Sequence, residues 1–186
     1  VRLKQVHSSR VHRVAEPWSE RPEGDALCTD RPGVVLGIVT ADCAPVLFAD
    51  LEAGVVGAAH AGWRGARSGV LENTVEAMIS FGARRNLIRA VIGPTIAQAS
   101  YEVDDAFREH FGAGDERFFA VGRSGRYQFD LPAYVAHRLQ AAGVVRIEDL
   151  AEDTYTQPDR FFSFRRATHR AEGAEGRQLS VIGLPA

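Results

Sequence analysis

The sequence has 186 residues, of which 45% are hydrophobic, and its 22 basic and 24 acidic side chains give a formal net charge of −2. A chain of this length can bury roughly 70% of its extended surface, so it needs neither a disulfide nor a metal in order to fold. The small net charge excludes a general attraction for nucleic acid, and no apolar run is long enough to cross a membrane. Two cysteines are too few for a secreted disulfide framework, and no signal peptide is recognisable, so we expect a cytoplasmic protein.

The first sixty residues predict one long loop followed by strands. Prolines, a glycine and acidic residues cluster over Ala15–Pro32, which predicts a loop. Val34–Thr40 is β-branched and apolar on both faces, as is typical of a buried strand. The run PVLFAD and the run Gly54–His60 predict two further strands, joined by a turn over Asp50–Gly54. The many Gly and Ala residues in the second run indicate that another element packs closely on it.

The rest of the chain mixes helices with short strands. Apolar residues at helical spacing, with capping residues at the ends, predict helices over about Gly69–Phe81, over VDDAFREHF, and over Leu131–Ala142 with Asp130 as its cap. Short apolar runs predict strands over Leu87–Gly93, Val144–Ile147, Phe161–Phe164 and Leu179–Leu184. Hairpins therefore occur beside crossovers, which favours an α+β domain over a regular βαβ ladder.

Three side chains stand out as ligands for a metal. The sequence contains no P-loop, G-x-G-x-x-G, HExxH, CxxC or G-x-S-x-G motif. It does contain His7 in KQVHSS, Cys43 in TADCAP and His60 in AAHAGW, the last two flanking the expected hairpin. A His/Cys/His set suits zinc and leaves one position free for water or substrate, as in catalytic zinc sites. Taken singly, each histidine is more often a satisfied or surface residue, and a lone cysteine is more often a small buried hydrophobe.

Five blocks of the sequence resemble, in the same order, those of the YfiH-like family, also called the laccase-domain or multicopper polyphenol oxidoreductase family. They are LKQVHSSRV, TADCAPVL, GAAHAGWRGA, AVIGPTIAQASYEV and FFSFRR. The resemblance implies that His7, Cys43 and His60 bind one Zn²⁺ ion. It implies a fold of mixed β-sheets layered between α-helices, an α/β/β/α sandwich. It also implies a single domain over residues 1–186 that lacks the N-terminal segment usual in the family.

The family is similar in activity to purine nucleoside phosphorylases. Its members cleave adenosine, inosine, guanosine and methylthioadenosine with phosphate, and they deaminate adenosine to inosine. The resemblance therefore implies a zinc-dependent purine nucleoside phosphorylase with adenosine deaminase activity. Its expected partners are purine nucleosides and inorganic phosphate, with no nucleic acid and no membrane.

Several charged residues near the three ligands are candidates for the chemistry. Arginine forks bind phosphate bidentately, so Arg64 is the first phosphate-binding candidate, with Lys4 and Arg10 behind it. A salt bridge that holds the turn is the structural alternative for Arg64. Asp42 is a candidate for orienting a ligand or moving a proton, and its alternative is a cap at a strand end. With Cys43 and His60, these give the expected catalytic set.

Other residues near the blocks are expected to be structural. Trp63 is a candidate for stacking on a base, although a large aromatic is more often core. Arg165 and Arg166 are expected to brace the site, and Cys28 is expected to be structural. The remaining histidines are expected in exposed loop or helix positions; they are His12, His110, His137 and His169.

Three other functions compete with this interpretation. A copper-dependent polyphenol oxidase would need more histidines than the six present, and a blue-copper site prefers an axial methionine. The single methionine, Met78, is expected on the core face of a helix. A cysteine hydrolase would use Cys43 with His60 as its base. A catalytically inactive zinc-binding module is the alternative outside enzymes.

Overall fold

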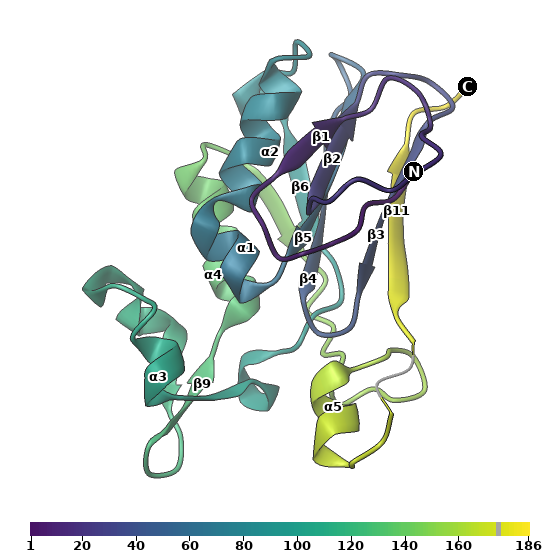
Figure 1. The fold of residues 1–186 in the computed structure, drawn as a ribbon. Helices are drawn as coiled ribbons and strands as arrows, with labels where there is room; N and C mark the ends of the chain where they lie inside the picture. Colours follow the sequence, from purple (N-terminus) through teal and green to yellow (C-terminus); the bar gives the residue numbers. More distant parts are fainter. Residues whose placement is uncertain (174–175) are drawn as a thin grey trace.

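A six-stranded mixed sheet forms the centre of the protein, in the order β1-β2-β5-β4-β6-β10 (Figure 1). The computed structural model describes residues 1–173 and 176–186. The inner strands pair antiparallel, and the two edge strands pair parallel to their neighbours. In sheet order the strands are β1 Val11–Arg13, β2 Ala26–Thr29, β5 Val55–Ala61, β4 Ala44–Asp50, β6 Arg89–Ile92 and β10 Arg146–Asp149.

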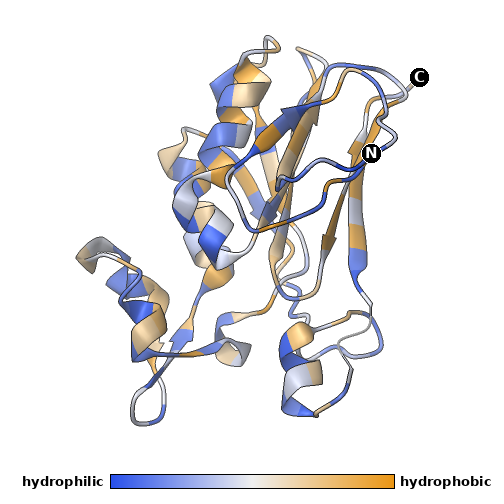
Figure 2. Cartoon of the chain, viewed as in Figure 1, coloured by the Kyte–Doolittle hydropathy of each residue, from blue (hydrophilic) through white to orange (hydrophobic). Residues whose placement is uncertain are grey.

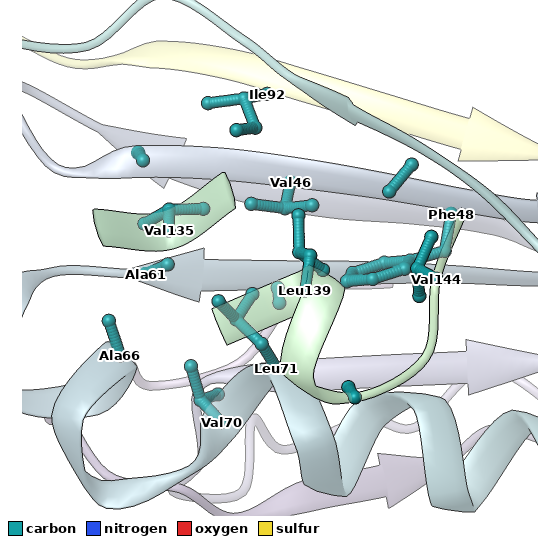
Figure 3. Close-up of a cluster of buried hydrophobic side chains, with 14 of the residues drawn as sticks. Val46, Phe48, Ala61, Ala66, Val70, Leu71, Ile92, Val135, Leu139 and Val144 are labelled. Atoms are coloured by element: carbon teal, nitrogen blue, oxygen red, sulfur yellow. The ribbon is translucent and has the colours of Figure 1, made fainter. Parts of the chain in front are cut away.

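Helices cover one face of this sheet. They are α1 Trp63–Ser68, α2 Val70–Ile79 and α4 Leu131–Ala141. Figure 3 shows Val46 and Phe48 of β4 meeting Leu71 of α2 and Leu139 of α4, and all four side chains are fully buried. Within the described part of the chain, no helix has the length and apolar character needed to span a bilayer.

A two-stranded sheet covers the opposite face. It pairs β3 Val35–Thr40 with β11 Gln178–Gly183 in antiparallel register. Side chains alternate along a strand, so each strand of the central sheet contributes to two cores. In β2, Ala26 and Cys28 belong to the core on the helical side, whereas Leu27 packs with residues of β3. Figure 2 accordingly shows apolar colour along the strands of both sheets.

Two smaller parts lie beyond one end of the central sheet (Figure 1). The first is a three-stranded sheet with a short helix, whose elements are β7 Glu102–Asp104, α3 Asp105–Arg108, β8 Phe119–Val121 and β9 Arg126–Phe129. The second is α5 Phe164–His169. Single 3₁₀ turns are formed by Arg85–Leu87 and Gln98–Ser100, and a longer one by Ala113–Phe118.

The structure confirms the expected mixed α+β class and most of its elements. The β4–β5 hairpin closes through residues 51–54, as expected. Close packing on the second strand is also confirmed, because a Cβ atom on Gly57 would lie 3.0 Å from Sδ of Met78 in α2. Met78 is fully buried there, and Asp130 caps α4 by accepting a hydrogen bond from the Ala133 backbone N–H.

Two predicted elements are wrong. The expected loop Ala15–Pro32 contains β2, which lies inside the central sheet, because four buried residues are too few to give a periodic signal. The expected strand Phe161–Phe164 is absent. Instead, the Ser163 hydroxyl accepts a hydrogen bond from the Arg166 backbone N–H and begins α5. A capping residue therefore outweighed the aromatic run that predicted a strand.

Candidate active site

The three predicted metal ligands lie together at one end of the central sheet. Their ligand atoms all lie within 4.8 Å of one another, and Cys43 Sγ is 3.8 Å from His7 Nε2. Among residues 1–173 and 176–186, they form the one group of three or more His, Cys, Asp or Glu side chains arranged to hold a metal. Residues 36 and 17 positions apart in sequence thus meet through the fold.

The β4–β5 hairpin places two of these ligands. Ala44 pairs with Ala61 and Pro45 with His60, so Cys43, just before β4, lies beside the end of β5. Ala59 and Ala61 belong to the core on the helical side, so His60 projects from the opposite face, next to the small sheet. His60 is only 4% exposed, whereas Cys43 is half-buried.

His7 belongs to the N-terminal segment and lies in a turn with a left-handed backbone conformation. Its backbone has a φ of 61°, in the left-handed region that residues with a Cβ seldom adopt. The backbone N–H groups of Val6, His7 and Ser8 all donate to the carboxylate of Asp25, at 2.6–3.3 Å. This fan of hydrogen bonds stabilises the turn and leaves the exposed His7 ring against the ring of His60, with centroids 4.8 Å apart.

Asp25 also binds His60 directly. Oδ1 of Asp25 lies 2.9 Å from Nδ1 of His60, and the His60 backbone N–H donates to the Asp25 carbonyl at 2.7 Å. The two residues are cross-strand neighbours, since Ala26 of β2 pairs with Ala59 of β5. Asp25 is fully buried, and the Ser8 hydroxyl donates to its second oxygen.

Contacts within the cluster shift the pKa values of Asp25, His60 and Cys43. Burial opposes ionisation of Asp25, but hydrogen bonds from His60 and Ser8 outweigh it and lower its pKa to about 2. Burial lowers the pKa of His60, yet its bonds to Asp25 and Cys43 raise that pKa to about 9. Burial likewise raises the pKa of Cys43, while His60 and His7 lower it overall to about 6. The cluster therefore favours a thiolate, the form in which cysteine binds metals.

The donors and the space around them fit zinc. Two imidazole nitrogens and one thiolate sulfur are the ligand types that zinc takes, and three protein ligands leave one position open. The turn after β5 leaves this space clear because residue 62 is glycine. A Cβ atom there would lie 2.9 Å from Cys43 Sγ and 2.9 Å from Cδ2 of His7.

The cluster opens into a cavity of about 630 Å³. Its walls come from the N-terminal segment, from the end of β3 and the loop before β4, from α1, from Tyr101 just before β7, and from α5. This is an ordinary size for a pocket that binds a small molecule. Positive charge dominates the walls, because one carboxylate, Asp42, faces five basic residues; these are Lys4, Arg21, Arg64, Arg165 and Arg177.

Comparisons with known proteins show the family to which the chain belongs. The family model described as multi-copper polyphenol oxidoreductase laccase matches residues 1–185. The chain belongs to this family. A purine nucleoside phosphorylase of Rickettsia prowazekii is 42% identical over 97% of this chain and 76% of its own length. Another from Deinococcus radiodurans is 42% identical over 99% of this chain and 70% of its own length. The crystal structure of the hypothetical protein YfiH from Bacillus licheniformis has a TM-score of 0.90 and 33% identity, covering 99% of this chain and 73% of that one.

The structure separates the three predicted phosphate-binding residues of this laccase-domain protein. Arg64 lies in the cavity wall, is exposed, and packs its guanidinium over the Trp63 ring at 4.7 Å. Among the described residues it has no hydrogen-bonding or ion-pair partner, so the salt bridge considered for it is not formed. Lys4 also lines the cavity, but its Nζ pairs with Glu23 at 2.9 Å. Arg10 lies outside the cavity lining and points toward the Glu23 carbonyl.

Asp42 lines the cavity, and each of its carboxylate oxygens also accepts a hydrogen bond from another part of the chain. Its Oδ1 accepts a hydrogen bond from the Thr154 hydroxyl at 2.7 Å, and its Oδ2 accepts one from the Arg165 backbone N–H at 2.6 Å. Arg166 donates to three backbone carbonyls, as expected for a brace. The two hydrogen bonds to Asp42 tie the loop before β4 to Thr154 and to α5.

Trp63 and the four histidines outside the metal cluster differ in their exposure and contacts. Trp63 is half-buried, lines the cavity, and stacks against His110 with ring centroids 5.0 Å apart. His110 and His169 are exposed, as expected, whereas His12 and His137 are half-buried. His12 is the clearest departure, because it lies in β1 and binds the Glu23 carbonyl at 2.8 Å.

Sequence reasoning missed Asp25, which contacts more of the site than any predicted acidic residue. It lies in GDALCT, inside the stretch assigned to a loop. No local signal marked this strand, because the four residues of β2 are too few to show a period and Asp25 lies directly before them. Cys28, in the same strand, is fully buried, as expected of a structural residue, and burial raises the pKa of its thiol to about 12.

Proposed function

We propose that this protein is a zinc-dependent purine nucleoside phosphorylase that also deaminates adenosine. The observation that carries the proposal is the His7–Cys43–His60 cluster at the base of an electropositive cavity. The relatives that are 42% identical are named purine nucleoside phosphorylases, which supplies the substrate class.

The three ligands would hold zinc in the cavity wall. Bound zinc supplies Lewis acidity and activates water, the chemistry that hydrolytic loss of an amino group requires. His7, Cys43 and His60 all line the cavity, so a zinc ion that they held would be accessible to a small molecule bound there. Deamination converts adenosine and water into inosine and ammonia, and no other co-reactant is needed.

Phosphorolysis needs an anion site beside the nucleoside. The bond between C1′ and the purine nitrogen breaks, an oxygen of phosphate bonds to C1′, and the purine leaves with the electron pair and takes up a proton. Arg64 is suited to hold the phosphate, because its guanidinium faces the cavity and forms no ion pair among the described residues. Burial raises the pKa of Tyr101, so its hydroxyl stays protonated as a donor in the cavity wall.

The geometry favours this function over the alternatives. A multicopper oxidase requires further histidine sites, yet the described residues offer one three-ligand group. Met78 is fully buried among core residues and is not placed to be an axial copper ligand. The lowered pKa of Cys43 suits a cysteine hydrolase as well as a metal site. Alkylation would stop a hydrolase that a strong chelator leaves active, whereas a chelator should stop the zinc enzyme.

The deciding experiment is chromatographic product analysis with adenosine, in the presence and absence of phosphate. We expect adenine and ribose 1-phosphate only with phosphate, and inosine under both conditions. Zinc-loaded protein that forms none of these products would reject the proposal in favour of an inactive zinc-binding module. Oxidation of a phenol by copper-loaded protein would instead support the oxidase.

The phosphate site is tested by comparing Arg64→Ala with Arg10→Ala. Loss of a charge-assisted hydrogen-bond donor costs about 1.5–3 kcal/mol, so Arg64→Ala should raise the KM for phosphate roughly 10- to 100-fold. Deamination, which uses no phosphate, should change little. Arg10→Ala removes an equal charge outside the cavity and should leave the KM for phosphate unchanged. Equal effects of the two variants would show that Arg64 acts only through general charge.

A further inference from the structure

The Asp25 carboxylate joins two of the metal ligands that come from different parts of the chain. Its Oδ1 lies 2.9 Å from the His7 backbone nitrogen and 2.9 Å from Nδ1 of His60. Its Oδ2 accepts from the Ser8 backbone N–H at 2.6 Å and from the Ser8 hydroxyl at 2.7 Å. Asp25 is fully buried, so no water competes for these bonds. One side chain thus contacts both the turn that carries His7 and the ring of His60.

The contact with His60 decides which ring nitrogen is free. An ionised carboxylate can only accept hydrogen bonds, so Nδ1 of His60 must carry the proton. In the neutral ring the lone pair then lies on Nε2, the nitrogen left for the cluster with Cys43 and His7. The backbone of His60 also donates to the Asp25 carbonyl, so ring and main chain are fixed by the same residue.

The contact with residues 6–8 decides where His7 lies. A φ of 61° is unfavourable for histidine, so this turn requires support from its surroundings. The N–H groups of three successive residues, Val6, His7 and Ser8, point at the one carboxylate. Replacing the carboxylate with an amide leaves one accepting oxygen and one NH₂ group that faces donors, so the turn loses part of its support and His7 its fixed position relative to His60.

We propose that Asp25 is the positioning residue of the metal site. It selects the His60 tautomer that presents Nε2, and it holds the left-handed turn that brings His7 to the same point. Asp25 is not among the residues that line the cavity, and it acts through the two histidines. This role rests on the proposed zinc site, and it predicts an effect on metal binding that is separate from any effect on folding.

The chain offers a matched control in Asp50. This residue is also a fully buried aspartate, and it accepts hydrogen bonds from the backbone N–H groups of Glu52, Ala53 and Arg84. It lies at the opposite end of β4 from Cys43. Both D25N and D50N replace a buried carboxylate with an amide whose NH₂ group faces donors, so both should lower the melting temperature of the metal-free chain.

The variants should differ in zinc affinity, measured by competition with a chromophoric chelator. Loss of a partner that orients a metal ligand typically weakens binding about 10- to 100-fold, so we expect D25N to lose affinity on that scale. D50N should bind zinc like the wild type. In the cobalt-loaded proteins, the visible d–d bands should change in D25N and stay unchanged in D50N. Wild-type affinity and spectrum in D25N would overturn the inference.

A measurement on the wild-type protein covers the case in which D25N does not fold. In long-range ¹H–¹⁵N spectra of zinc-loaded protein, His60 should show a protonated Nδ1 and a zinc-bound Nε2. Zinc on Nδ1 would overturn the inference even with the metal bound. A wild-type chain that binds no zinc would reject the proposed function, and this inference with it.

Discussion

At each end of the β4–β5 hairpin a buried aspartate accepts hydrogen bonds from three backbone N–H groups, but only one of the two ends carries metal ligands. At the closed end, Asp50 is fully buried and accepts hydrogen bonds from three backbone N–H groups around the turn. At the open end, Asp25 is fully buried and accepts from three successive backbone N–H groups of the N-terminal segment. The open end adds two side-chain donors to the carboxylate that the closed end lacks, the Ser8 hydroxyl and the ring of His60.

The contact with the His60 ring separates a structural turn from a functional one. Backbone N–H groups cannot bind a metal or change protonation near neutral pH, so the Asp50 end only stabilises the hairpin. A histidine in the same hydrogen-bond network can do both. The proximity of Cys43 and of the basic cavity then makes the open end suited to chemistry. Three predictions test this contrast.

The largest effect is expected from removing a ligand at the open end. Cys43→Ala and His60→Ala should each abolish zinc binding and reduce turnover by more than the roughly 10- to 100-fold typical of losing an outer partner. The fold should remain, because Asp25 keeps its backbone donors in either variant. Zinc content and product formation are the measurements. Cys28→Ala, at the buried cysteine of β2, should retain both, and a zinc-free Cys28→Ala chain would contradict the assignment of Cys43 as the ligand.

A smaller effect is expected from filling the space beside the ligands. Gly62→Ala adds a Cβ atom 2.9 Å from Cys43 Sγ and from the His7 ring, so zinc affinity should fall about tenfold or more. Gly62 has a φ of −70°, which any residue adopts, so the loss would come from crowding alone. Gly112 also precedes a helical turn in extended conformation, with nothing within 4 Å of an added Cβ. Gly112→Ala should leave zinc affinity intact, and an equal loss in both variants would refute the crowding explanation.

The smallest effect on activity is expected at the closed end. Burial raises the pKa of Asp50, but the N–H groups of Arg84, Ala53 and Glu52 outweigh it and hold that pKa below its usual 3.8. A lowered pKa stabilises the fold above the unfolded-state pKa, and this contribution is lost as the pH falls through the folded-state value. D50N should therefore cost about 1–3 kcal/mol of unfolding free energy near neutral pH, and less below about pH 4. Denaturant unfolding across this pH range measures the difference, which would stay constant if Asp50 were protonated throughout.

Much of the fold could be predicted from local patterns. Strand β3, the β4–β5 hairpin and helices α2 and α4 have long apolar runs or clear caps, and the structure contains each of them. Element β2 was missed because four residues carry no readable period, and its burial depends on β5 and β1 on either side. The run that leads into α5 was misassigned because two of its aromatic residues, Phe162 and Phe164, are exposed rather than paired in a sheet.

In the candidate site, too, some features follow from local sequence patterns and others only from tertiary contacts. The sequence by itself determined the three ligand types and placed two of them at the ends of hairpin strands, because strand periodicity and turn residues are local properties. Only the tertiary structure decided that Asp25 would support His60 and His7, that Asp42 would brace α5, and that Arg64 rather than Arg10 would face the cavity. Each of these outcomes depends on contacts between residues far apart in the chain, such as the 35 positions between Asp25 and His60. Such contacts arise when strands and loops pack together, and no local pattern of residues encodes them.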